Sequence, residues 1–151
     1  MYYWGTGQRA FLGFGATLDC SHCNNRVVEQ IYATYSYEQA VIFRWKHLGD
    51  RGSEEGDGVI LFLCPTCMYG TQALGAEAAE REKKKIAKTQ GGTAAAAFAI
   101  DIENQLKSVQ ARFDMRYTRE WFNSLNLLAK HSHVKLLQRL GLYKIAEQLG
   151  S

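Results

Sequence analysis

The chain has 151 residues, of which 46% are hydrophobic and 22% charged, and a formal net charge of +3. This composition is typical of a globular protein with one domain or two small ones. No run approaches the roughly 18 consecutive apolar residues of a membrane-spanning helix, so we expect no membrane partner. Residues 1–11 lack the basic and apolar regions of a signal peptide, which predicts a cytoplasmic protein.

Short segments of the first half have the composition of β-strands. Residues 26–37 and 40–47 are rich in β-branched and aromatic side chains, and residues 58–63 form an apolar run that ends at Cys64. A polar, glycine-rich loop, residues 49–58, separates the last two segments. The pattern predicts a small antiparallel β-sheet within residues 1–70.

All four cysteines fall into two CxxC pairs, Cys20-Ser-His-Cys23 and Cys64-Pro-Thr-Cys67. Two such knuckles together supply the four thiolates of a tetrahedral Zn²⁺ site. The pairs lie farther apart than the roughly 15–20 residues of compact zinc motifs, because the predicted strands are inserted between them. We therefore predict one structural Zn²⁺ per chain, bound by Cys20, Cys23, Cys64 and Cys67. A shell of four cysteines leaves no position for a catalytic water.

Three alternatives for the cysteines stay open. Cys64 and Cys67 could be a thiol oxidoreductase pair, but such a pair needs a strand-to-helix junction in a βαβ unit, and no βαβ pattern precedes it. The four cysteines could form disulfides, which a reducing cytosol disfavours. His22, inside the first knuckle, could also be a metal ligand, although four cysteines already complete the shell.

Beyond the cysteine pairs, the first half contains two further distinctive segments: Tyr3-Trp4-Gly5, and Gly13-Phe-Gly-Ala-Thr-Leu-Asp before Cys20. With these segments, residues 1–70 resemble the zinc-ribbon 15 family of small microbial proteins. The resemblance implies a zinc ribbon and the four cysteines as ligands, and it brings no settled activity. The chain departs from the family pattern after each knuckle, where Asn24 and Met68 replace glycine.

The second half reads as helical. Residues 71–90 are strong helix formers with few apolar side chains, which predicts a solvated connector helix that ends at Gly91-Gly92. A second helix follows, with Thr93 as its expected N-cap. Its apolar residues recur every three or four positions and define one buried face: Phe98, Ile102, Leu106, Val109 and Phe113.

Three shorter helices complete the predicted bundle. Thr118 and Ser132 are the expected caps of the first two, and Gly141 is the expected end of the second. Residues 142–149 form the last one. The side chains expected to point inward from the first are Trp121, Phe122, Leu125 and Leu128.

The predicted fold class is α+β. Residues 1–70 form an N-terminal zinc ribbon, a small antiparallel β-sheet with two CxxC knuckles. Residues 71–92 form a charged connector helix and a Gly-Gly joint. Residues 93–151 form a C-terminal helical region or small helical bundle.

The distribution of charge bears on the partner. Residues 1–70 hold five Lys or Arg against seven Asp or Glu, residues 71–92 five against three, and residues 93–151 eight against five. An acidic ribbon is a poor binder of phosphate, so we expect the helices to dock a protein partner or a second copy, with Trp121 as the anchor. The alternative is a nucleic-acid- or ribosome-associated protein. Its contacts would be Lys83, Lys84, Lys85, Arg112, Arg116 and Arg119.

No feature of the sequence predicts an enzyme. It has no HExxH, P-loop, GxSxG or Rossmann glycine fingerprint. His131-Ser-His133 lies at a predicted helix junction, where we expect solvated capping residues. We expect a non-catalytic protein-interaction module whose zinc is structural.

Overall fold

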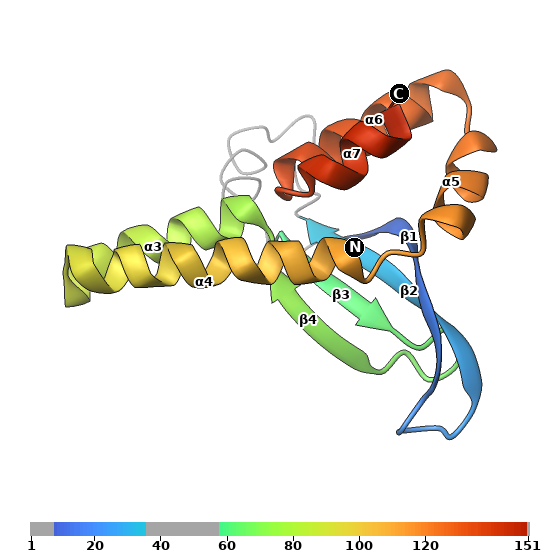
Figure 1. Cartoon of the computed structure of the whole chain (residues 1–151), viewed down its shortest axis with the longest axis horizontal. Helices are drawn as coiled ribbons and strands as arrows, with labels where there is room; N and C mark the ends of the chain where they lie inside the picture. The colour runs from blue at the N-terminus through green and yellow to red at the C-terminus, as the bar shows by residue number, and fades with distance from the viewer. Residues whose placement is uncertain (1–7, 36–57, 151) are drawn as a thin grey trace, which may run out of the picture.

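In the part of the chain that the structure describes, four β-strands precede the helices: β1 (Gln8–Asp19), β2 (Arg26–Tyr35), β3 (Val59–Leu63) and β4 (Gly70–Leu74). The structure is a computed structural model that describes residues 8–35 and 58–150. The strands form one antiparallel sheet in the order β1-β2-β3-β4, so each strand pairs with the next one in the chain (Figure 1). Five helices follow, and the class is α+β as predicted.

One face of the sheet is the floor of the hydrophobic core. Ile31 lies opposite Phe62, and Ala33 lies opposite Ile60, and all four are buried. Their neighbours along the strands point to the other face, because side chains alternate along a strand. The strands expected at residues 26–37 and 58–63 are confirmed within the described part. The expected strand 40–47 and all but the last residue of the loop 49–58 lie outside the described residues, as does the Tyr3-Trp4-Gly5 segment.

The fourth strand corrects the prediction of a helix from residue 71. Residues 70–74 pair with β3, from Gly70 opposite Leu63 to Leu74 opposite Val59. Gly70 is needed for this close approach, because a Cβ at this position would overlap the carbonyl oxygen of Phe62. Pairing with β3 therefore overrides the helix propensity of Gln72, Ala73 and Leu74.

Helices α3 (Ala76–Gln90) and α4 (Gly92–Ala111) form an antiparallel hairpin that projects from the rest of the molecule (Figure 1). Gly91, with φ of +97°, ends α3 as predicted and also takes the N-cap position of α4. The prediction of Thr93 as the N-cap is therefore wrong, because the N-cap lies two residues earlier in the chain. Val109 and Phe113 of the predicted apolar face are buried, whereas Phe98 and Ile102 are half-buried because only α3 covers this part of α4.

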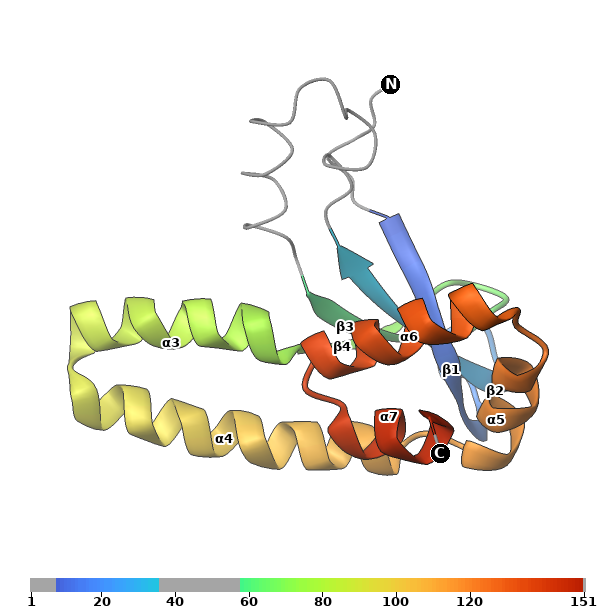
Figure 2. The same cartoon turned by 90° about the horizontal axis from the view of Figure 1, so that it is seen from above.

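Helices α5 (Met115–Asn123), α6 (Leu127–Arg139) and α7 (Tyr143–Gly150) lie beside the sheet (Figure 2). Asp114 caps α5, and its carboxylate accepts from the backbone N–H of Arg116 and Tyr117. Asn126 caps α6 in the same way. The predicted caps Thr118 and Ser132 are wrong because both lie inside helices. Gly141 follows α6 with φ of +85°, as expected for a residue beyond a helix end.

A single core cluster joins the sheet to the helices. It contains residues of β1, β2 and β3 together with buried side chains of α4 to α7: Leu12, Ile31, Ile60, Phe62, Val109, Phe122, Leu137, Leu142, Ile145 and Leu149. Leu128, expected to point inward, is instead 75% exposed. The division of the chain at residues 70 and 92 stays a prediction.

Two polar contacts fix the helices on β1. Thr118 is fully buried, and its hydroxyl both accepts from the backbone N–H of Phe14 at 3.0 Å and donates to the carbonyl of Phe14 at 3.3 Å. The Nε2 atom of His133 lies 3.1 Å from the carbonyl oxygen of Leu12. The expectation that His131 and His133 are both solvated is therefore wrong for His133, which is 7% exposed. It holds for His131.

Candidate metal centre

Each cysteine pair occupies the turn of a β-hairpin. Residues 20–25 connect β1 with β2, and residues 64–69 connect β3 with β4. Because β2 and β3 pair in antiparallel fashion, with Gln30 opposite Leu63, both turns lie at the same end of the sheet. The sheet topology thus brings together two motifs that lie far apart in the sequence.

The two turns have the same backbone geometry. In each, the first cysteine donates its N–H to the carbonyl five residues later and accepts at its own carbonyl from the N–H four residues later. The four hydrogen bonds are Cys20 N to Asn25 O, Asn24 N to Cys20 O, Cys64 N to Tyr69 O and Met68 N to Cys64 O, all 2.8–2.9 Å. This repetition indicates one function for both turns.

The residue after each pair adopts a left-handed conformation. Asn24 has φ of +60° and Met68 has φ of +59°. These are the two positions at which the zinc-ribbon 15 pattern has glycine, which reaches positive φ without strain. Met68 adopts the left-handed conformation at a steric cost, and Asn24 at a smaller one.

The four sulfur atoms form one cluster. Cys20 Sγ lies 3.7 Å from Cys67 Sγ, and Cys23 Sγ lies 3.7 Å from Cys64 Sγ. All four lie within 4.8 Å of one another. A metal–sulfur bond of about 2.3 Å in tetrahedral geometry requires sulfur atoms about 3.8 Å apart. The cluster can therefore hold a metal ion, whereas a disulfide needs about 2.05 Å, and all four cysteines are free.

The turns also supply hydrogen-bond donors to the sulfurs. Cys20 Sγ accepts from the N–H of Cys23 at 3.5 Å, and Cys64 Sγ accepts from the N–H of Thr66 at 3.4 Å. The N–H of Cys67 does most to lower the pKa of the Cys64 thiol to about 6; burial opposes this shift and the Thr66 N–H adds to it. The turn thus stabilises a thiolate at Cys64.

Cys67 has the opposite tendency. Desolvation by burial raises the pKa of Cys67 to about 12; the Tyr69 N–H opposes this shift, and the neighbouring sulfurs of Cys20 and Cys64 add to it. The four thiols therefore do not all ionise in the absence of a cation, because thiolates so close together repel each other. A divalent cation at the centre would remove that repulsion, and metal binding would release the remaining protons.

Two of the sequence alternatives can be compared with the structure. The chain continues after Cys67 into β4, so Cys64 and Cys67 do not precede a helix as in a thioredoxin-like pair. His22 is exposed, and its ring stacks on that of Tyr69 with centroids 4.0 Å apart. Among the described residues, the group that can hold a metal comprises the four cysteines.

A comparison of the chain with protein-family models, with curated proteins and with solved structures finds no match in any of the three. The resemblance to the zinc-ribbon 15 family stays a prediction. Among the residues that the structure describes, no helix is both long enough and apolar enough to cross a membrane.

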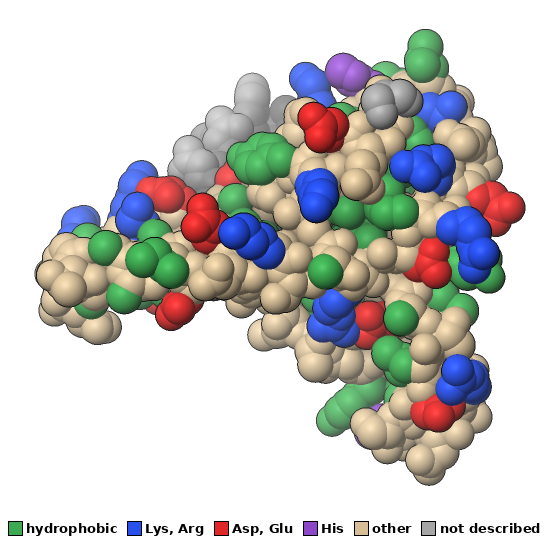
Figure 3. Space-filling view, in the orientation of Figure 1, with side chains coloured by type: hydrophobic (Ala, Val, Ile, Leu, Met, Phe, Trp, Pro, Cys, Tyr) green, Lys and Arg blue, Asp and Glu red, His purple; other side chains and the backbone are tan. Residues whose placement is uncertain are grey.

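The predicted nucleic-acid contacts lie on different helices. Residues 83–85 lie on α3, in the projecting hairpin, whereas Arg112, Arg116 and Arg119 lie at or beyond the far end of α4 (Figures 1 and 3). Arg112 is also engaged in an ion pair, because its Nη2 atom lies 2.6 Å from a carboxylate oxygen of Glu29, although its side chain is 40% exposed. The nucleic-acid contacts stay a prediction.

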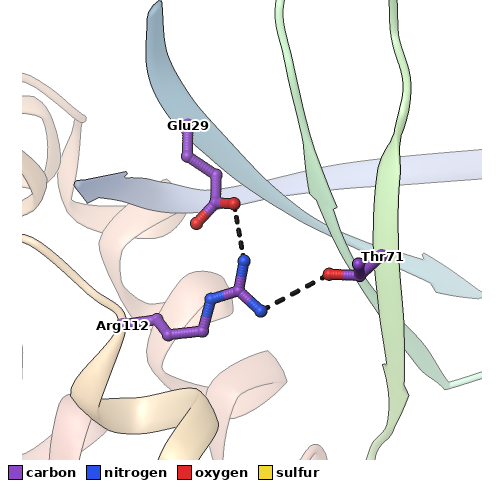
Figure 4. A network of polar contacts seen from close by, with 3 residues as sticks. All are labelled: Glu29, Thr71 and Arg112. Atoms are coloured by element: carbon purple, nitrogen blue, oxygen red, sulfur yellow. Dashed lines mark hydrogen bonds and ion pairs between the residues drawn. The ribbon is translucent and has the colours of Figure 1, made fainter. Parts of the chain in front are cut away.

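Sequence reasoning missed the polar network beside the cysteines. Arg112, at the end of α4, binds Glu29 of β2 and donates to the Thr71 hydroxyl of β4 at 3.4 Å (Figure 4). Its guanidinium also lies over the Phe62 ring, 3.7 Å from the centroid. The strand alternation contained a signal, because Glu29 shares a face with the buried Val27 and Ile31. A carboxylate at such a position needs a cationic partner.

Proposed function

We propose that Cys20, Cys23, Cys64 and Cys67 bind one Zn²⁺ per chain and that the sheet with its two knuckles is a zinc ribbon. The observation that carries the proposal is the cluster of four sulfurs, with cross-turn distances of 3.7 Å. Soft thiolate ligands in a tetrahedral arrangement select zinc or iron, and a closed shell of four thiolates is typical of structural zinc. The metal would hold the two hairpins together at the end of the sheet that the helices do not cover.

Metal analysis of the purified chain tests the site. We expect one zinc per chain, and Co²⁺ substitution should give the absorption of a tetrahedral thiolate complex. Cys20→Ser and Cys64→Ser should each lose the metal and unfold at a lower temperature. His22→Ala is the matched control, because His22 lies in the same turn but belongs to no ligand set, and it should keep the metal. Protein without metal, with a reversible Cys64–Cys67 disulfide at a cytosolic potential, would establish the redox alternative.

We further propose that the protein is a non-catalytic interaction module whose C-terminal helices dock a protein partner. The support is the exposure of large apolar side chains on these helices, with Leu127 83% and Leu128 75% exposed. Trp121, the anchor expected from the sequence, is instead half-buried, with its ring 4.8 Å from Phe11 and 5.0 Å from His133. The exposed leucines are the better anchors.

Capture of the full chain from cells, with and without nuclease and across salt concentrations, separates the two partner classes. Capture of a protein partner should persist after nuclease treatment and depend little on salt concentration. The double variant Leu127→Ser with Leu128→Ser should lose the captured partner, and the triple change of Lys83, Lys84 and Lys85 to Gln should retain it. Nuclease-sensitive capture that the lysine change abolishes would favour the nucleic-acid alternative, because counterion release makes phosphate binding steeply salt-dependent.

A further inference from the structure

An apolar groove lies between α5, α6 and the end of α7. Its volume is about 870 Å³, and its apolar lining consists of Phe122, Leu127, Leu128, Val134 and Leu149. Phe122 and Leu149 are buried and form part of the molecular core, whereas the two leucines at the start of α6 stand in solvent. We call this hollow the α6 groove.

The two exposed leucines are not required by the fold. They occupy the first turn of α6, directly after the Asn126 cap, at positions where polar residues would serve the helix equally well. They also belong neither to the core cluster nor to the side chains packed against it. Two adjacent exposed leucines beside an apolar hollow are typical of a docking site.

The charge around the groove is positive. Its charged or titratable lining residues are Lys130 and His131, and the Nζ atom of Lys130 lies 5.9 Å from the centre of the Phe122 ring. Helices α5 to α7 together carry six Lys or Arg against two Glu, and α6 itself has no acidic residue. Figure 3 shows Lys and Arg side chains over these helices. An occupant that complements this surface is apolar on one side and acidic beside it.

The same charge argues against the two other occupants. A symmetric dimer through this groove would bring the Lys130 side chains of both copies, and helices with a net charge of +4 in each copy, near one another, and like charges across an interface are unfavourable. A nucleic acid bound in this groove would cover the exposed Leu127 and Leu128, and its phosphates gain nothing from desolvating two leucines.

We propose that the α6 groove docks an acidic amphipathic helix of another protein. Its apolar stripe, with positions i, i+3, i+4 and i+7, packs on Leu127, Leu128 and Val134, and its Asp or Glu side chains lie beside the stripe, facing Lys130. This inference rests on the interaction role proposed above and specifies the partner's chemistry. Most of the affinity comes from the apolar contacts, and the charges select the partner.

A displayed peptide library tests the proposal on the full-length, metal-loaded protein. The probe is an 18-residue helix with a fixed leucine stripe, in which the polar positions vary among Glu, Lys, Gln and Ser. We expect selection on the wild-type protein to enrich Glu beside the stripe. The best peptide, labelled and titrated, should bind the Leu127→Ser, Leu128→Ser double variant at least tenfold more weakly. Ile100→Ser, at a 59% exposed apolar position on α4, is the matched control and should bind normally.

A charge reversal adds a second, independent readout. Lys130→Glu should weaken binding of the acidic peptide and strengthen binding of the peptide in which each Glu is replaced by Lys. Lys135→Glu, on the same helix but outside the groove, should leave the binding of both peptides unchanged. The proposal would be overturned if the selected peptides showed no preference for Glu beside the stripe. It would also be overturned if the wild-type protein enriched peptides no more than the leucine double variant does. So would self-association that the double variant abolishes, observed by sedimentation.

The test separates this inference from the broader interaction role. A partner captured from cells could survive the leucine double variant but be lost on Tyr69→Ser, a change at an exposed position just before β4. In that case the groove proposal fails and the interaction role stands. If only nucleic acid is captured, and the peptide library yields nothing, both fail.

Discussion

His133 should make the folded protein sensitive to acid. Its ring is enclosed by Trp121 and Phe122, and its Nε2 atom contacts the Leu12 carbonyl at 3.1 Å, so the neutral tautomer with a proton on Nε2 fits the site. Desolvation by burial lowers the pKa of His133 from its ordinary value of 6.5 to about 4, although the Leu12 hydrogen bond acts in the opposite direction.

The sign of the effect follows from proton linkage. Between the two pKa values the unfolded chain binds a proton that the folded chain does not, so stability is present above pH 6.5 and is lost as the pH falls towards 4. From pH 7.5 to 5.5 this group alone should lower the free energy of unfolding by about 1.4 kcal/mol, and by about 3 kcal/mol once the pH is below both pKa values.

Urea denaturation of metal-loaded protein at pH 7.5 and 5.5 measures the loss. His133→Gln removes the titration while keeping a donor for Leu12, and His131→Gln removes an exposed histidine two residues away on the same helix. Acid also weakens thiolate–metal bonds in every variant, so the informative quantity is the difference between variants. We expect His133→Gln to lose about 1.4 kcal/mol less than the wild type, and His131→Gln to lose as much as the wild type.

Equal losses for the wild type and His133→Gln would refute the reasoning, because the histidine would then titrate alike in both states. Nitrogen chemical shifts of the imidazole provide a direct check. They should show a neutral ring with the proton on Nε2 at pH 5.5. A protonated ring at that pH in the folded chain would place His133 in contact with water.

Three further changes test the geometry around the metal centre, each by chemical denaturation of the metal-loaded chain. Met68→Gly should raise the free energy of unfolding by up to about 1 kcal/mol, because φ of +59° strains any residue with a Cβ. Met68→Val should lower it, and equal stability of the two variants would contradict the strain. Gly70→Ala should lower the free energy of unfolding by about 2–3 kcal/mol, because its Cβ would overlap the Phe62 carbonyl and force β4 away from β3. An unchanged denaturation midpoint would mean that the sheet adapts to the added Cβ. Arg112→Met should cost about 2–3 kcal/mol because it leaves Glu29, whose side chain is 10% exposed, without a partner. Adding Glu29→Gln should recover at least about 1 kcal/mol, and an additive loss would show that the ion pair is not coupled.

The local features of this protein follow from the sequence alone. The spacing of the cysteines within each pair determines that both thiols of a turn can face one ion, and the structure brings all four together. Gly91 and Gly141 end helices as predicted, because positive φ and helix termination are properties of a few neighbouring residues. The apolar periodicity of residues 98–113 likewise identified two buried residues, Val109 in α4 and Phe113 just beyond its end.

Tertiary structure decided every feature whose partner lies far along the chain. Residues 71–74 became a strand because the edge of β3 offers backbone hydrogen bonds that outweigh a weak local preference. From the sequence alone Thr118 is a reasonable helix cap, but its hydroxyl forms hydrogen bonds with Phe14, a residue 104 positions earlier in the chain. His133 is buried because β1 and α5 pack against it, and this burial keeps the ring neutral although the Leu12 hydrogen bond favours the protonated form. In each case the stabilising free energy comes from desolvation and from pairing between segments that lie far apart in the chain. Apolar periodicity and secondary-structure propensity are local properties of the sequence, so they do not predict these contacts.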